Sequence, residues 1–252
     1  MEKDIREQKI SDLLKKNGIV YVKELSEMLN ISEVTVRTYL TNMERKGLLS
    51  RVHGGAISSY KPYYSMNMTQ RLETNQSEKV NIATKVASMI APNDTIMFNS
   101  GTTTLLTFRR LPAKYNLSIV TNSIAIALEA SSNPNYNVVL VGGSLNTKYQ
   151  FSYGSDAVSQ LRNYHADKLI LSVDGVDTSN GFTTYYNTEA DVDRCMIEQA
   201  DKCIVVADYS KFNRTAFAKI SGISIADSIV TDARLDTNTH SAFKELGPHI
   251  YF

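Results

Sequence analysis

Apolar and polar residues recur at a helical spacing in three short segments near the N-terminus. These segments cover residues 4–17, 23–29 and 32–46, and the hydroxyl of Ser32 is suited to cap the third helix. Only a few residues separate the second segment from the third, which is typical of a helix-turn-helix. The apolar positions that we expect to face inward are Ile5, Ile10, Leu13, Leu14, Leu25, Met28, Leu29, Val34, Val36, Leu40 and Met43.

Two short apolar runs, residues 47–52 and 56–57, follow the third helix and flank His53-Gly54-Gly55. They predict a hairpin, the wing of a winged helix-turn-helix domain over residues 1–57. In such a domain the third helix enters the major groove of double-stranded DNA and the wing approaches phosphates. A helical interaction module that never binds nucleic acid is the alternative, which the hairpin disfavours. The residues that we expect to contact operator DNA are Ser32, Glu33, Thr35, Arg37, Thr38, Thr41, Arg51 and His53.

Residues 58–76 form a polar and aromatic stretch in which Pro62 interrupts any continuous helix, so they predict a linker. Beyond it, short apolar runs at residues 95–98, 117–121, 137–141, 168–173, 203–207 and 228–231 predict strands, with amphipathic helical segments between them. This alternation predicts an α/β domain over residues 77–252, built on a mainly parallel, helix-covered sheet. Ligands of such sheets bind beyond the carboxyl ends of the strands.

Polar residues that could bind a phosphorylated ligand follow several of these strands. At residues 99–103 a strand gives way to a helix; Gly101 allows a tight turn, and free amides with hydroxyls suit a phosphate. Lys211 could neutralise a phosphate, and carboxylates could accept hydrogen bonds from sugar hydroxyls. Each motif alone is equally typical of a turn or a helix cap. The residues that we expect to bind a small phosphorylated sugar or polyol are Asn99, Ser100, Gly101, Thr102, Thr103, Asn122, Gly143, Asp174, Asp177, Glu189 and Lys211.

The composition of the 252-residue chain excludes several classes of protein. A hydrophobic content of 42% and a charged content of 21% are ordinary for a globular protein, which excludes disordered and fibrous classes. Cys195 and Cys203 are too few and too far apart for a zinc site, so we expect no metal and no cofactor. No apolar run approaches the roughly twenty residues that span a bilayer, so we expect a cytoplasmic protein without membrane contact.

Basic residues are concentrated between Val34 and Arg71, although the net charge of the chain is only +1. This stretch holds Arg37, Arg45, Lys46, Arg51, Lys61 and Arg71, against Glu44 as its acidic residue. Such a local excess favours a polyanionic partner.

The N-terminal motifs resemble those of the DeoR family of bacterial repressors. The resemblance rests on Val22-Lys-Glu-Leu25, Ser32-Glu-Val-Thr-Val-Arg37-Thr-Tyr-Leu40 and Gly47-Leu-Leu-Ser-Arg-Val-His-Gly-Gly-Ala56. Where the family usually has Arg-Arg-Asp-Leu, this chain has Arg37-Thr38-Tyr39-Leu40. The difference indicates a changed phosphate contact or a different operator sequence.

The second half resembles the effector domain of the same family, which shares its fold with ribose-5-phosphate isomerase and glucosamine-6-phosphate deaminase. The resemblance implies a DNA-binding repressor of carbohydrate-utilisation genes that a sugar phosphate releases. We expect a homo-oligomer, because two-fold operators follow from two-fold proteins. The matching motifs are Ser100-Gly-Thr-Thr103, Thr121-Asn-Ser123, Gly142-Gly143, Asp174-Gly-Val-Asp177, Gly181-Phe-Thr183, Glu189-Ala190 and Asp208-Tyr-Ser-Lys211.

A sugar-phosphate isomerase with an attached DNA-binding module is the alternative function. Asp174, Asp177, Glu189 and Lys211 are of the residue types that move protons next to a carbonyl group. The isomerase resemblance calls for a lysine soon after the aspartate motif, and residues 178–186 contain none, so a donor to the oxyanion is missing. We therefore predict a sensor and no enzyme activity. A constitutive architectural DNA binder would leave the strand-end chemistry unused and ranks last.

Overall fold

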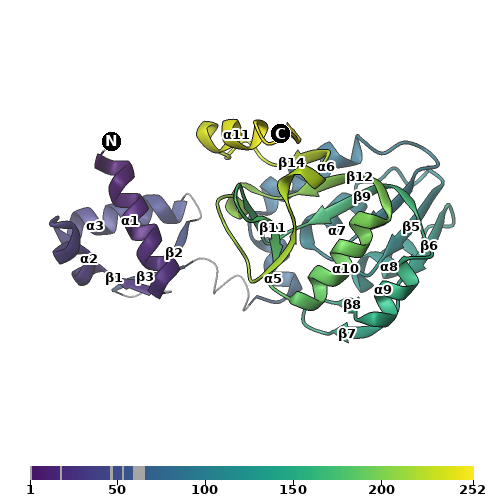
Figure 1. Cartoon of the computed structure of the whole chain (residues 1–252), viewed down its shortest axis with the longest axis horizontal. Helices are drawn as coiled ribbons and strands as arrows, with labels where there is room; N and C mark the ends of the chain where they lie inside the picture. Colours follow the sequence, from purple (N-terminus) through teal and green to yellow (C-terminus); the bar gives the residue numbers. More distant parts are fainter. Residues whose placement is uncertain (1, 18, 46–47, 53, 59–65) are drawn as a thin grey trace. The chain divides into compact units, whose positions relative to one another are not determined.

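The structure, a computed structural model, describes residues 2–17, 19–45, 48–52, 54–58 and 66–252. The chain divides into two compact units, Met1–Asn67 and Met68–Phe252 (Figure 1). His53, one of the residues expected to contact DNA, lies outside the described residues.

The first unit packs three helices against a small antiparallel sheet with the strand order β1-β3-β2. The hairpin of β2 and β3 is the predicted wing, and the winged helix-turn-helix arrangement is confirmed. Residues from all three helices, among them Ile10, Leu25 and Leu40, share one core. The elements are α1 (Glu2–Asn17), β1 (Ile19–Tyr21), α2 (Val22–Leu29), α3 (Glu33–Arg45), β2 (Leu49–Val52) and β3 (Gly55–Ser58).

Three apolar side chains expected to face inward are exposed instead: Val34 is 70% exposed, Met28 60% and Ile5 54%. The prediction was wrong for Val34 because Val36, which is fully buried, lies two positions away, on the opposite side of a helix with 3.6 residues per turn. The buried face of α3 is completed by Tyr39, Leu40 and Met43.

The second unit is built on a seven-stranded sheet in which every neighbouring pair of strands is parallel, in the order β15-β14-β12-β9-β4-β5-β6. This confirms the predicted parallel α/β class. Six of these strands were predicted, and the edge strand β15 was not. The strands are β4 (Thr95–Phe98), β5 (Leu117–Thr121), β6 (Tyr136–Leu140), β9 (Ala166–Ser172), β12 (Ala200–Val206), β14 (Ser228–Val230) and β15 (His249–Tyr251).

Helices cover both faces of this sheet (Figure 1). Alternate residues of one strand belong to different cores: Met97 lies in one hydrophobic cluster, and its neighbours Ile96 and Phe98 lie in the other. The alternation follows from strand geometry, which points successive side chains to opposite faces. The helices are α5 (Met68–Glu73), α6 (Gln76–Ala87), α7 (Thr102–Phe108), α8 (Ile124–Ala130), α9 (Ser155–Leu161), α10 (Asn187–Glu198) and α11 (Thr237–Lys244).

Two further β structures were not predicted. A hairpin pairs β7 (Ser144–Asn146) with β8 (Phe151–Tyr153). A second antiparallel sheet has the order β10-β11-β13, with β10 at Gly175–Asp177, β11 at Gly181–Thr184 and β13 at Ala218–Ser221. These strands have three or four residues each, too few to show a clear alternation in the sequence.

Helix α5 falls within residues 58–76, the stretch expected to be a linker. Met68 at its start is buried in the same cluster as Phe98 and Leu105, so α5 belongs to the core of the second unit. Arg71, which the sequence grouped with the basic DNA-facing stretch, is therefore a residue of the second unit.

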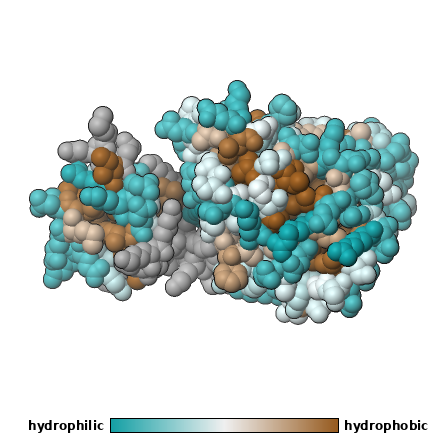
Figure 2. Space-filling view, in the orientation of Figure 1, coloured by the Kyte–Doolittle hydropathy of each residue, from teal (hydrophilic) through white to brown (hydrophobic). Residues whose placement is uncertain are grey.

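The visible surface of the second unit is mostly hydrophilic, with separate hydrophobic areas (Figure 2). Phe217 and Leu128, at 81% and 72% exposure, are the most exposed large apolar side chains described in this unit. Among the helices of the described residues, none is long and apolar enough to cross a membrane.

Candidate functional site

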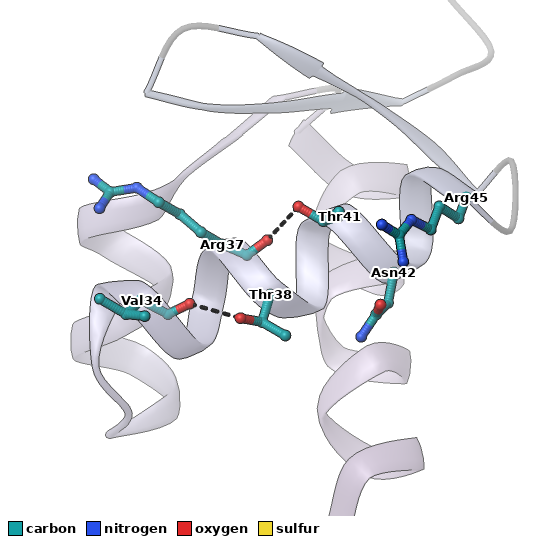
Figure 3. Close-up of a pocket in the computed structure, with 6 residues that line it drawn as sticks. All are labelled: Val34, Arg37, Thr38, Thr41, Asn42 and Arg45. Carbon is teal, nitrogen blue, oxygen red and sulfur yellow. Dashed lines mark hydrogen bonds between the residues drawn. The ribbon is translucent and has the colours of Figure 1, made fainter.

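The exposed face of α3 carries a stripe of side chains, all but one of them polar, that line a shallow hollow (Figure 3). Its residues recur every three or four positions, and they lie opposite the buried side chains Val36, Leu40 and Met43. We call this set the α3 stripe; its members are Val34, Arg37, Thr38, Thr41, Asn42 and Arg45.

Local hydrogen bonds position the N-terminal half of α3. The Thr35 amide donates to the Ser32 hydroxyl at 3.2 Å, so Ser32 caps the helix as predicted. Arg37 Nη2 lies 2.8 Å from Glu33 Oε2, one turn earlier. Both side chains remain about half exposed, which leaves their polar atoms accessible to a partner.

The wing contacts α3 through Arg51. Its backbone amide donates to Glu44 Oε1 at 2.6 Å, and its guanidinium donates to the Thr41 hydroxyl at 3.0 Å. Arg51 thus lies beside the α3 stripe, and its side chain remains exposed.

A second group of polar residues lies at the carboxyl ends of β9 and β12. Asp174 follows β9, and its Oδ1 atom is 3.7 Å from both Lys211 Nζ and Arg71 Nη1. The three side chains are only 8–12% exposed. The Arg71 guanidinium also lies 4.1 Å from the centre of the Tyr149 ring. We call Arg71, Asp174, Glu189 and Lys211 the charged cluster.

Glu189 and Asp193 project from α10 toward this cluster. Thr184 donates its hydroxyl proton to Glu189 Oε2 at 2.5 Å. Burial raises the pKa of Glu189 to about 7, and the nearby carboxylate of Asp174 acts in the same direction. Burial also raises the pKa of Asp193 well above its usual range. Glu189 therefore changes charge near neutral pH.

Lys211 lies between two carboxylates. Burial lowers its pKa to about 8, although Asp174 and Asp208 oppose this change. Burial also raises the pKa of Asp208, but Lys211, Lys79 and the hydrogen bonds from Ser210 together keep the pKa of that carboxyl below its usual range. Asp208 accepts hydrogen bonds from the Ser210 amide and the Asn75 side chain at 3.0 and 3.1 Å.

The loop before α7 packs directly on the end of β9. A Cβ atom at Gly101 would lie 2.5 Å from the Cβ atom of Ser172. Three residues connect β4 to α7, and because the φ of Gly101 is an extended 178°, lack of space for a side chain, and not an unusual backbone conformation, requires glycine here. The side chain of Asn99 donates to the Ser172 carbonyl at 2.9 Å and to Asp193 Oδ1 at 3.0 Å, so it fixes this loop.

Three of the expected effector residues have other contacts in the structure. Asp177 accepts hydrogen bonds from the amides of Ser179 and Asn180, which shapes the β10–β11 turn. Asn122 is fully buried and donates to the Ser152 carbonyl at 3.1 Å. Gly143 follows β6, with a positive φ of 139°. None of these contacts links them to the charged cluster.

The sequence did not identify several residues around the charged cluster. Arg71 and Tyr149 come from α5 and the β7–β8 hairpin, so no motif near a strand end marked them. Asp193 is one turn beyond Glu189 on α10, and that spacing was an available signal. Within the described residues, no group of three His, Cys, Asp or Glu side chains is arranged to hold a metal ion.

Comparisons with known proteins extend over both units. The DeoR-like helix-turn-helix domain matches residues 6–61, and the DeoR C terminal sensor domain matches residues 74–233. The chain is 30% identical to the putative aga operon transcriptional repressor of Escherichia coli O157:H7, over 97% of this chain and 92% of that one. It is 31% identical to the glycerol-3-phosphate regulon repressor of Escherichia coli (strain K12), over 92% of both chains.

Among solved structures, ribose 5-phosphate isomerase A from Methanocaldococcus jannaschii is similar, with a TM-score of 0.41 and 15% sequence identity. The similarity covers 55% of each chain. Similarity at this level says nothing about activity.

Proposed function

Since this chain belongs to the DeoR family of transcriptional regulators, we propose that it represses a carbohydrate-utilisation operon until a small phosphorylated sugar or polyol releases it from operator DNA. The names of the two relatives, repressors of an aga operon and of a glycerol-3-phosphate regulon, support a role in carbohydrate use. A regulator of transcription acts where the DNA is, so we place the protein in the cytoplasm.

In this proposal the operator is contacted by α3 and the wing. The N-terminal half of α3 faces base edges in the major groove, and Arg51 approaches a phosphate. One winged unit buries too little surface for operator affinity, so two or more copies bind together as a homo-oligomer. The contact residues are Ser32, Glu33, Thr35, Arg37, Thr38, Thr41, Arg51 and His53.

The single observation that carries the effector proposal is the charged cluster. Lys211 and Arg71 are buried cations that both lie 3.7 Å from Asp174. A phosphate is a stronger partner for two cations than one carboxylate is, because it carries more charge and more acceptor oxygens. Gly101 lies against Ser172 at the end of β9, and in this proposal its loop, Ser100 to Thr103, supplies amides and hydroxyls to the phosphate. Asp174 and Glu189 then accept hydrogen bonds from the hydroxyls of the sugar.

Release of DNA follows in this proposal from the position of Arg71. Arg71 belongs to α5, the first helix after the segment that connects the two units. A phosphate that binds Arg71 and Lys211 changes the contacts of α5 and so acts on the connection to the DNA-binding unit. A ligand shifts the DNA-binding equilibrium only through its different affinities for the two states.

An isomerase activity is the second candidate, and the pKa of Glu189 favours it. A carboxyl group that titrates near pH 7 suits a general base. The sequence argued against this candidate because no cation was available to stabilise an enediolate, yet Arg71 lies beside Asp174. We still propose a sensor, because the chain belongs to a family of regulators. Interconversion of aldose and ketose phosphates that disappears in Glu189→Gln would decide for the enzyme.

The proposed effector site is tested by Lys211→Ala. Hydrogen bonds to charged groups are worth about 1.5–3 kcal/mol, so this variant should bind the effector roughly ten to a hundred times more weakly. Its operator affinity without effector should stay unchanged, so it should repress even when the inducing sugar is supplied. Calorimetry with triose, pentose and hexose phosphates and inorganic phosphate measures the first effect. A DNA release assay measures the second.

Lys114→Ala is the matched control, since Lys114 is an exposed lysine of the same unit that precedes β5, away from the carboxyl ends of the strands. It should behave as the unaltered protein in both assays. If Lys211→Ala binds sugar phosphates and releases DNA normally, the effector site is elsewhere.

A further inference from the structure

The α3 stripe contains one apolar side chain, Val34, among polar ones (Figure 3). An exposed apolar residue is common on protein surfaces and means little by itself. Val34 differs because of its position. It is the second residue of α3, one turn before Arg37 and Thr38, in the half of the helix that reaches base edges in winged helix-turn-helix proteins.

Neither helix formation nor packing explains a valine here. The core of the unit takes Val36, Tyr39 and Leu40 from the opposite face of α3, and Val34 is 70% exposed. β-Branched residues are also poorer helix formers than alanine or lysine at an exposed position. The side chain thus has no evident role in the folded unit, which directs attention to the partner of this face.

The two threonines of the α3 stripe, Thr38 and Thr41, offer no hydroxyl proton to a partner. Thr38 donates to the carbonyl of Val34 at 3.0 Å, and Thr41 donates to the carbonyl of Arg37 at 2.8 Å. A hydroxyl has a single proton to donate, so neither side chain has one left for DNA, and Thr41 already accepts from the Arg51 guanidinium at 3.0 Å. The Val34 side chain is therefore an apolar contact between hydroxyls that have no proton left to donate and the half-exposed guanidinium of Arg37.

From this arrangement we infer that Val34 packs on the C5-methyl group of a thymine in the major groove and selects that base. The inference rests on the proposed function, because it requires α3 to lie in the major groove. Thymine alone among the four bases presents a methyl group there. The two methyl groups of valine can pack on it, and they cannot hydrogen bond to the polar atoms that the other bases present.

Deoxyuridine tests this contact, because it pairs as thymidine does and lacks only the methyl group. Operator duplexes are first selected from a random-sequence pool with the full-length protein, and each thymine is then replaced singly. We expect one thymine in each half-site at which replacement weakens binding about fourfold, the effect of withdrawing one methyl group from an apolar contact.

The same series with Val34→Ala completes the test. This variant should bind the thymine duplex at least as weakly as the unaltered protein binds the deoxyuridine duplex, and deoxyuridine at that position should cause no further loss. Alanine favours helix, so the unit should stay folded, which circular dichroism checks. Leu128→Ala is the control, because Leu128 is equally exposed but belongs to the second unit. Each deoxyuridine replacement should weaken the binding of this variant as much as it weakens the binding of the unaltered protein.

Two results would overturn the inference and leave DNA binding standing. In the first, each replacement of thymine by deoxyuridine weakens the binding of Val34→Ala as much as it weakens the binding of the unaltered protein. In the second, Val34→Ala loses self-association with its deoxyuridine penalties unchanged, which would assign Val34 to a contact between copies. A pool in which no sequence is enriched would overturn the inference together with the proposed DNA-binding function.

Discussion

The α3 stripe and the charged cluster place charge in opposite surroundings. The stripe comes from one helix, and its ion pair, Arg37 with Glu33, is about half exposed. The charged cluster joins side chains from separate segments, and Lys211 and Asp174 are almost completely buried. Water solvates the first set, so its charges cost little and contribute little to stability. Burying the charges of the second set costs free energy, and the pKa values of Glu189 and Lys211 shift accordingly.

The largest difference between the two regions should appear in stability. Lys79 adjoins the charged cluster: it is buried, and its Nζ atom donates to the carbonyl of Arg71 at 2.5 Å, close to the carboxylate of Asp208. Lys79→Ala would leave a buried charge poorly compensated, and we expect a loss of about 3–5 kcal/mol in the free energy of unfolding of the second unit. Arg37→Ala should change that of the first unit by less than about 0.5 kcal/mol. Denaturant unfolding measures both, and equal losses would contradict the comparison.

A pH dependence should distinguish the charged cluster next. Burial raises the pKa of Glu189 to about 7, above that of a carboxyl in an unfolded chain. Between about pH 5 and pH 7 the folded protein then holds a proton that the unfolded chain has released, so stability falls as pH rises. Glu189→Gln should remove a slope of about 1 kcal/mol per pH unit.

Glu198→Gln, an exposed change on the same helix, is the control for this slope. Thermal unfolding across that pH range provides the measurement for the three proteins. If Glu189→Gln keeps the slope of the unaltered protein, another group is responsible.

The smallest effect concerns the exposed region. If Arg51 contacts one phosphate, Arg51→Ala should reduce the salt dependence of operator binding by about one counterion. Arg162→Ala, an exposed arginine of the second unit, should leave it unchanged. Operator titrations at several salt concentrations measure this dependence. If Arg51→Ala has the same dependence as the unaltered protein, the wing is not part of the proposed DNA interface.

The same contrast explains how much could be predicted from the sequence. The α3 stripe is local, so spacing and the Ser32 cap located the helix correctly. The error at Val34 concerned which side of the helix is buried, since Val34 and Val36 cannot lie on the same face. The sheet was predictable because its central strands are buried apolar runs. The edge strand β15 has three residues with only Ile250 partly buried, too weak a pattern to recognise.

The charged cluster was predictable only in part. Asp174 and Lys211 follow strands, and parallel strands bring their carboxyl ends to one edge. Arg71 follows no strand and reaches Asp174 only because α5 packs into the second core. Asp177 follows Asp174 closely in sequence, yet its carboxylate accepts hydrogen bonds from the amides of the β10–β11 turn, a contact that the sequence did not indicate.

The position of α5 matters for anyone who builds hybrid repressors from this protein. A junction at residue 77, where the sequence alone divides the chain, would supply the sensor without α5 and so without Arg71. A junction before Met68 keeps the whole second unit. Hybrids joined before Met68 should respond to the proposed sugar phosphate at the operator of the other repressor. Hybrids joined at residue 77 should not respond to it.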